Sequence, residues 1–169
     1  MFKKFYPKEC AESSYDINYK RIYERGYRGI LFDIDNTLVK HDAPADEKAI
    51  RLINDLKQMG FQICLISNNG EERVKLFNKE VKLKFIFDAG KPMVKNYNKA
   101  MKLMGTNTSN TIFVGDQLFT DIYGANRAGL RSYFVKPIGP EIEVQIKIKR
   151  KLEKIVIFFY NKQNRRNKI

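Results

Sequence analysis

Short apolar segments alternate with amphipathic helical patterns along residues 29–135, and this alternation constrains the fold more than any other feature. Each apolar segment has the length of a buried strand, and apolar residues in the stretches between them recur at steps of three and four. This order predicts an α/β fold in which a parallel five-stranded sheet lies between two helical layers, a three-layer Rossmann-like arrangement. The expected strands are residues 29–32, 61–66, 85–87, 111–114 and 132–135, and the expected helices are residues 44–59, 71 onward, 92–104 and 118–128.

Polar side chains follow the expected strands at the points where those strands end. They are Asp33 and Asp35, Ser67, Lys91 and Asp116. In an open parallel sheet, ligands bind beyond the carboxyl ends of the strands, so we expect these side chains to converge on one edge. This edge is the predicted functional site.

The chemistry of these residues suits phosphoryl transfer. Two carboxylates two residues apart, Asp33 and Asp35, can divide the roles of nucleophile and proton donor. Asp116 and Asp121 in GDQLFTD add hard oxygen ligands for Mg²⁺. Each residue also has a structural alternative, since Asp, Ser and Asn cap helices and turns, but the complete set in this order favours the catalytic interpretation.

The same segments carry a family resemblance. DIDNT, Ser67 after an apolar strand, Lys91-Pro92 and GDQLFTD resemble the four motifs of the haloacid dehalogenase (HAD) superfamily, subclass IIIA. Across essentially the whole chain the sequence is similar to the YqeG-type phosphatases of that superfamily, through YRGILFDIDNTLV, LISNNGEERVKLF, AGKPM and VGDQLFTDIYGANRAG. That group is in turn similar to the mitochondrial phosphatidylglycerophosphate phosphatases.

The resemblance implies a mechanism. Asp33 would be the nucleophile that forms an aspartyl-phosphate. Asp35 would be the general acid for the leaving alkoxide and then the general base for water. Mg²⁺ would be held by Asp33, the backbone carbonyl of Asp35 and Asp116.

The resemblance also assigns supporting roles. Ser67, Asn68 and Lys91 would bind the phosphoryl group. Asp121 and Thr37 would either contact the metal or support its ligands. Outside these motifs, we expect His41 to lie in an exposed loop and Arg73 to be solvated on a helix surface.

The spacing of the motifs leaves no room for an inserted cap domain. From Asp35 to Ser67 there is space for one helix, and the segment from Ser67 to Lys91 is shorter still. We therefore expect a minimal cap and an open site that admits bulky substrates, with a second copy of the chain as an alternative cover.

The positive charge is concentrated at the C-terminus. The formal net charge is +13, and residues 147–169 contain nine Lys or Arg and one acidic residue, Glu153. We divide the chain into an N-terminal arm (1–28), a HAD phosphatase core (29–140) and a basic amphipathic helix and tail (141–169). A basic patch of this kind attracts a polyanion such as an anionic membrane surface.

We expect the C-terminal segment to form a helix with its apolar residues on one stripe. The stripe either inserts into an anionic membrane, with Phe2, Phe5 and Tyr6 as a second contact, or docks on the sheet and leaves the basic face solvated. Its residues are Val144, Ile148, Leu152, Ile155 and Phe159.

The residues at the strand ends predict a Mg²⁺-dependent phosphomonoesterase. The family resemblance, together with the basic tail, implies that it converts phosphatidylglycerophosphate to phosphatidylglycerol on the cytoplasmic face of a membrane. No apolar run approaches the roughly 18–20 residues that span a bilayer, so we expect a peripheral protein. A soluble phosphatase acting on a small ester or a nucleotide is one alternative. A nucleic-acid-binding protein on the same fold is another, although the chain contains no recognisable nucleic-acid module and we do not expect such a partner.

Overall fold

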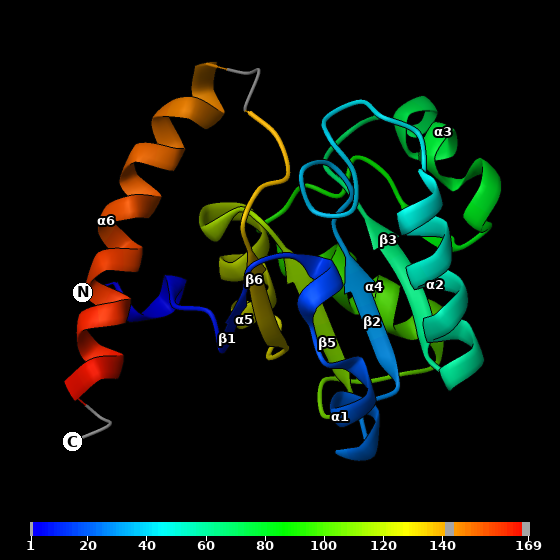
Figure 1. Cartoon of the computed structure of the whole chain (residues 1–169), viewed down its shortest axis with the longest axis horizontal. Helices are drawn as coiled ribbons and strands as arrows, with labels where there is room; N and C mark the ends of the chain where they lie inside the picture. The colour runs from blue at the N-terminus through cyan, green and yellow to red at the C-terminus, as the bar shows by residue number, and fades with distance from the viewer. Residues whose placement is uncertain (1, 141–143, 167–169) are drawn as a thin grey trace.

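The protein is an α/β domain with a C-terminal helix along one side (Figure 1). The structure is a computed structural model that describes residues 2–140 and 144–166. In chain order its elements are η1 (Lys3–Phe5), β1 (Glu9–Ala11), η2 (Ser14–Asp16), α1 (Tyr19–Glu24), β2 (Gly29–Phe32), α2 (Glu47–Met59), β3 (Gln62–Ile66), α3 (Glu71–Val81), β4 (Lys84–Ile86), α4 (Val94–Met104), β5 (Thr111–Gly115), the π-helical turn η3 (Leu118–Ile122), α5 (Tyr123–Arg127), β6 (Arg131–Val135) and α6 (Val144–Arg166).

The sheet is parallel throughout, in the order β1-β6-β5-β2-β3-β4. The parallel α/β class is confirmed, but the expected number of five strands is wrong. The sixth strand, β1, pairs with β6 at the sheet edge. The three residues of β1 show no apolar pattern that could predict a strand, because none of them is buried. They form a strand because their backbone pairs with β6.

Alternate side chains of the central strands enter two separate cores. Ile30 and Phe32 of β2 face a core covered by α1, α2 and α3, whereas Leu31 faces a second core covered by α4 and α5. Because both faces are covered, the central strands read as continuous apolar runs without alternation.

The helix boundaries differ in detail from the expected ones. Helix α2 starts at Glu47, because the Asp46 carboxylate accepts a hydrogen bond from the Ala49 N–H (2.8 Å) and caps it. It ends at Met59, as expected, and is capped by Gly60, whose φ of 100° favours glycine. The helix expected over residues 118–128 is a π-helical turn, η3, followed by the short helix α5.

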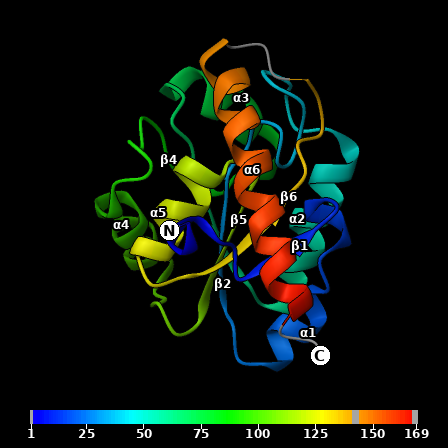
Figure 2. The ribbon, with the colours of Figure 1, turned by 90° about the vertical axis from the view of Figure 1, so that its left-hand side faces the viewer.

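Helix α6 packs beside η3 and the N-terminal segment (Figures 1 and 2). Val156 of α6 lies in a small third core with Leu118 and Ile122. Phe2 stacks on Phe159 with ring centroids 5.8 Å apart, so the N-terminal aromatic residues contact the protein itself. None of the described helices is long and apolar enough to cross a membrane.

The apolar stripe expected to anchor or dock α6 faces outward. Ile148, Leu152, Ile155 and Phe159 are 42–58% exposed. Docking of this stripe on the sheet is therefore wrong, and the helix packs through a different face that includes Val156 and Ile157. The side chain of Val144 lies outside the described residues.

Candidate active site

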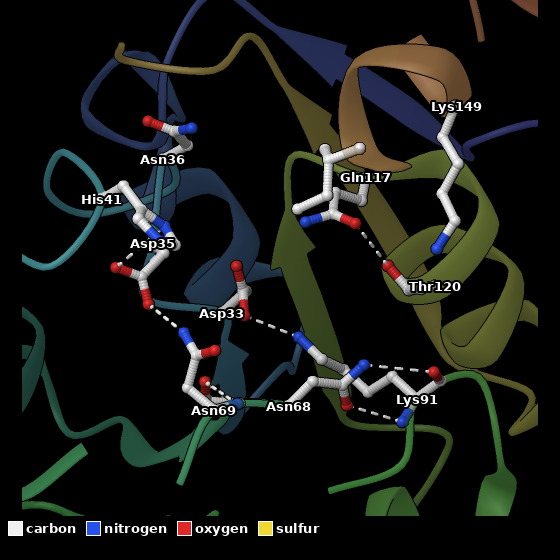
Figure 3. A pocket seen from close by; sticks show the side chains of 12 residues that line it. Asp33, Asp35, Asn36, His41, Asn68, Asn69, Lys91, Gln117, Thr120 and Lys149 are labelled. Carbon is white, nitrogen blue, oxygen red and sulfur yellow. Dashed lines mark hydrogen bonds and ion pairs between the residues drawn. The ribbon is translucent and has the colours of Figure 1, made fainter. Parts of the chain in front are cut away.

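The polar residues that follow the central strands meet in one pocket of about 230 Å³ (Figure 3). Strand β2 lies between β3 and β5, so the loops that follow these three strands are neighbours at the same edge of the sheet. The pocket is lined by Asp33, Asp35, Asn36, His41, Ser67, Asn68, Asn69, Lys91, Gln117, Thr120, Ile146 and Lys149. Asp116, Asp121 and Thr37 are buried beside this group.

Lys91 is the cation at the centre of the site. Its Nζ lies 2.6 Å from Asp33 Oδ1 and 2.7 Å from Asp121 Oδ1, and all three side chains are buried. Asp121 packs directly against Gly115, where a Cβ would lie only 2.6 Å from Asp121 Oδ2. The glycine before Asp116 therefore makes room for the second carboxylate of the motif.

Asp116 is held from two sides. The Thr37 hydroxyl donates a hydrogen bond to Asp116 Oδ1 (3.1 Å). The Arg150 guanidinium of α6 donates to both the carboxylate and the backbone carbonyl of Asp116. Asp116 itself is completely buried.

The buried carboxylates of Asp33, Asp116 and Asp121 outnumber the two cations that contact them in the described part of the chain, Lys91 and Arg150. Burial raises the pKa of Asp33 to about 7, although Lys91 opposes the shift. Burial likewise raises the pKa of Asp116 well above its usual range, against the opposing effect of Arg150. The pKa of the Lys91 ammonium is raised because, although burial lowers it, Asp121 and Asp33 outweigh that effect.

This donor set fits a divalent cation. Asp33, Asp116 and Asp121 can each direct one carboxylate oxygen so that the three lie within 4.8 Å of one another. Hard oxygen ligands of this type suit Mg²⁺, and added positive charge would lower the electrostatic cost of three buried carboxylates.

Asp35 points to the other side of the pocket from the cluster around Lys91 (Figure 3). Its carboxylate accepts hydrogen bonds from Asn69 Nδ2 (2.7 Å), from Arg73 Nη2 (2.8 Å) and Nε (3.1 Å), and from the Asp42 N–H (2.8 Å). The His41 ring lies 3.8 Å away. These contacts orient the carboxylate from several directions.

Two expectations about the surroundings of Asp35 are wrong. The Arg73 side chain is 10% exposed, and it is not solvated because it pairs with Asp35. The His41 side chain is 16% exposed and lines the pocket, so it does not lie in an exposed loop. Arg73 follows Ser67 by six residues and lies in the first turn of α3, and this short spacing was the available clue.

Ser67 and Asn68 take part in the pocket in different ways. The Ser67 hydroxyl oxygen accepts a hydrogen bond from the Asn69 N–H (3.1 Å). The Asn68 side-chain amide grips the backbone of Lys91, accepting from its N–H (2.7 Å) and donating to its carbonyl (3.2 Å). Asn68 thereby positions Lys91, and direct phosphate binding by its side chain stays a prediction.

Helix α6 contributes a wall of the pocket that the sequence analysis missed. Ile146 and Lys149 line it, and Arg150 and Glu153 contact the loop that carries Asp116. The segments between β2, β3 and β4 each hold one helix, in agreement with the minimal cap. The clue to the role of α6 was Glu153, the one acidic residue in the basic segment.

Comparisons with known proteins identify the family to which the chain belongs. A sequence model of the haloacid dehalogenase-like hydrolase family matches residues 41–129. The probable phosphatase YqeG of Bacillus subtilis is 35% identical over 159 residues, which cover 93% of this chain and 92% of that protein. Phosphatidylglycerophosphate phosphatase 1 (chloroplastic/mitochondrial) of Arabidopsis thaliana is 26% identical over 133 residues, which cover 73% of this chain and 38% of that protein.

A solved structure shows the same fold. The 3-deoxy-D-manno-octulosonate 8-phosphate phosphatase of Moraxella catarrhalis, in complex with magnesium, phosphate and KDO, matches with a TM-score of 0.52 at 18% identity. The match covers 68% of this chain and 72% of that chain. With a family match over half of the sequence and a relative that is similar along nearly its whole length, the chain belongs to the haloacid dehalogenase-like hydrolase family.

Proposed function

We propose that the protein is a Mg²⁺-dependent phosphomonoesterase in which Asp33 is the nucleophile and Asp35 the proton donor. The observation that carries this proposal is the division of the two carboxylates between different surroundings. Asp33 lies in the buried cluster with Lys91 and Asp121, whereas Asp35 is held by Arg73 and Asn69 on the other side of the pocket. Two carboxylates in different environments can take different roles in one reaction. The order of the two residues in the family motif assigns the attack on phosphorus to Asp33 and the proton transfer to Asp35.

The reaction has two steps. In the first, an Asp33 oxygen forms a bond to phosphorus while the bond from phosphorus to the leaving oxygen breaks, and Asp35 gives that oxygen a proton. In the second, Asp35 takes a proton from water, the water oxygen bonds to phosphorus, and phosphate leaves Asp33 as a free carboxylate. Lys91 neutralises charge next to the attacking group throughout.

Mg²⁺ would be held by Asp33, the backbone carbonyl of Asp35 and Asp116, with Asp121 beside them. When bound, it neutralises negative charge on the phosphoryl oxygens. Ser67 lies at the same edge of the pocket, where its hydroxyl can donate to a phosphoryl oxygen.

A phosphate-release assay tests this mechanism. With an aryl phosphate as substrate, we expect release that requires Mg²⁺, stops in EDTA and is lost in Asp33→Asn. Asp35→Asn should slow turnover while leaving Mg²⁺ binding in place, because its carboxylate is not a proposed ligand. Release that persists in Asp33→Asn would reject Asp33 as the nucleophile.

We further propose that the substrate is phosphatidylglycerophosphate at an anionic membrane surface. The outward face of α6 supports this proposal, because apolar side chains on it are exposed next to lysines. The exposed apolar residues are Ile148, Leu152, Ile155, Phe158 and Phe159, and the exposed lysines are Lys147, Lys151, Lys154 and Lys162. Each lysine near an anionic surface contributes about 1 kcal/mol of attraction, while apolar side chains enter the interface.

The position of α6 links this surface to the pocket. Lys149 lies on the same helix and lines the pocket, so its ammonium is available to a second anionic group of the substrate. Phosphatidylglycerophosphate carries a phosphodiester near its phosphomonoester and matches this arrangement. The similarity to the Arabidopsis phosphatase points to the same substrate.

Vesicle binding and lipid turnover test the lipid proposal together. Wild-type protein should co-sediment with vesicles containing phosphatidylglycerol and should release phosphate from phosphatidylglycerophosphate in mixed micelles. The double variant Leu152→Glu/Ile155→Glu should lose both properties but keep aryl phosphate hydrolysis. The matched control is the double variant Leu76→Glu/Leu103→Glu, which places two glutamates at exposed leucines of α3 and α4.

Two results would contradict the lipid proposal. Equal vesicle binding by the double variant and wild type would exclude this face as the contact. Hydrolysis of aryl phosphate without any release from the lipid would leave the phosphatase mechanism in place and favour a soluble substrate.

A further inference from the structure

Helix α6 makes polar contacts with the catalytic loop in addition to its apolar packing. The helix is held against η3 by Val156 and Ile157, which pack near Leu118 and Ile122. One turn before Val156, Glu153 is buried to 4% exposure, although its neighbours Leu152 and Lys154 are exposed. A buried carboxylate on an otherwise basic helix requires specific partners, because burial of an unpaired charge is costly.

Those partners belong to the loop that carries Asp116. Glu153 Oε1 accepts a hydrogen bond from the Leu118 N–H (2.7 Å), and Glu153 Oε2 accepts one from Arg150 Nη1 (2.8 Å). Arg150 in turn donates to the backbone carbonyl and to the carboxylate of Asp116. Arg150 and Glu153 therefore hydrogen-bond to the backbone on both sides of Gln117.

We propose that Arg150 and Glu153 are positioning residues that set the direction of the Asp116 carboxylate, so that α6 is a structural part of the active site. This inference rests on the proposed phosphatase function, in which Asp116 is a metal ligand. Thr37 holds one carboxylate oxygen and Arg150 the other, and together they fix the plane of the carboxylate. An ionised carboxylate has about four lone-pair sites, so a hydrogen-bonded oxygen can still face a metal ion.

Packing alone does not explain this arrangement. An apolar side chain at position 153 could join the cluster of Val156 and Ile157 without the cost of desolvating a carboxylate, and buried ion pairs are often no more stabilising than such replacements. What an apolar residue could not do is accept the Leu118 N–H and align Arg150. Hydrogen-bonded partners of a metal-ligating carboxylate commonly contribute a factor of about 10–100 in metal affinity or activity.

Binding of Mg²⁺ to the full-length protein without substrate tests the proposal directly. Titration calorimetry on Glu153→Ala and Arg150→Met should show Mg²⁺ affinity reduced by about 10–100-fold. Glu153→Gln keeps an acceptor for the Leu118 N–H and should retain most of the affinity. Glu80→Ala and Arg51→Met change the same residue types at exposed helix positions and should bind Mg²⁺ as wild type does.

Kinetics on an aryl phosphate provide the second readout. At saturating Mg²⁺, Glu153→Ala and Arg150→Met should lower kcat while the KM for the aryl phosphate stays near the wild-type value. A structural role limited to packing would reduce thermal stability in Glu153→Ala and Glu153→Gln without changing Mg²⁺ affinity.

Two outcomes would overturn the proposal. Unchanged Mg²⁺ affinity in both Arg150→Met and Glu153→Ala would show that α6 merely packs against the loop. Higher affinity in Arg150→Met would show that the guanidinium competes with the metal. Failure of the proposed phosphatase function would be seen separately, because the wild-type protein would then release no more phosphate than Asp33→Asn.

Discussion

Replacing Lys91 by methionine removes the ammonium group that lies between Asp33 and Asp121. The methionine side chain fills a similar volume, so the variant isolates the effect of charge. Lys91 is buried and contacts both carboxylates at less than 3 Å, at 2.6 and 2.7 Å. Removing one partner of a buried ion pair leaves an uncompensated charge and costs about 3–5 kcal/mol.

The size of this loss should depend on pH. Burial already raises the pKa of Asp33 from 3.8 to about 7 in the presence of Lys91, and loss of the lysine raises it further. A folded protein that binds a proton more tightly than its unfolded chain loses stability as pH rises from the unfolded pKa to the folded pKa. In wild type this window lies between about 4 and 7, and in Lys91→Met it extends above 7. The loss of stability should therefore be larger at pH 8 than at pH 5.

Urea unfolding in EDTA at these two pH values measures the loss. Adding Mg²⁺ should then restore part of it, because a ligand that binds only the folded state stabilises it and the excess negative charge favours the cation. We expect Mg²⁺ to increase the free energy of unfolding more in Lys91→Met than in wild type.

The reasoning is refuted by either of two results. A loss below about 1 kcal/mol at pH 8 would fall outside the range for a broken buried pair. An equal or smaller effect of Mg²⁺ in the variant would mean that Lys91 does not balance the charge of the metal-binding carboxylates.

Three further changes test the electrostatics of the site. In EDTA, Asp33→Asn should be more stable than wild type at pH 8 but not at pH 5, because the raised pKa makes the ionised carboxylate destabilising; urea unfolding that shows no pH dependence in the difference would contradict this. Thr37→Val should weaken Mg²⁺ binding in calorimetry, because it removes a buried hydrogen bond to Asp116 worth about 1.5–3 kcal/mol; unchanged affinity and stability would reject that role. Lys149→Gln should raise the KM for phosphatidylglycerophosphate and leave that for an aryl phosphate unchanged, and an equal effect on both substrates would exclude a contact with a second anionic group.

Much of the fold follows from local patterns along the chain. The apolar segments before Asp33, Ser67 and Asp116 are buried strands, because a strand covered by helices on both faces needs a continuous apolar run. Their parallel pairing brings the three loops to one edge, so the part of the pocket that these loops form could be predicted from the strand ends. The proposed roles of the individual residues stay predictions until the variants above are measured.

The contacts around the carboxylates could not be predicted in the same way. Apart from its short spacing from Ser67, nothing in the sequence around Arg73 distinguishes it from a solvated arginine on a helix surface. Its ion pair with Asp35 depends on the packing of α3 beside the loop that carries Asp35. The outward direction of Ile148 and Leu152 was equally hidden, because a helix with apolar residues on more than one face has no unique buried side.

Sequence by itself determined the strands, the loops that follow them and the residue types that meet at the sheet edge, because burial and turn chemistry act over a few residues. Tertiary structure decided which side of α6 faces the domain. It also brought Arg150 and Glu153 to the Asp116 loop, across 34 and 35 residues. Such contacts depend on how whole elements pack against one another, and a buried carboxylate or guanidinium is placed only where that packing brings it a partner. No local pattern in the chain encodes which distant residue that partner is.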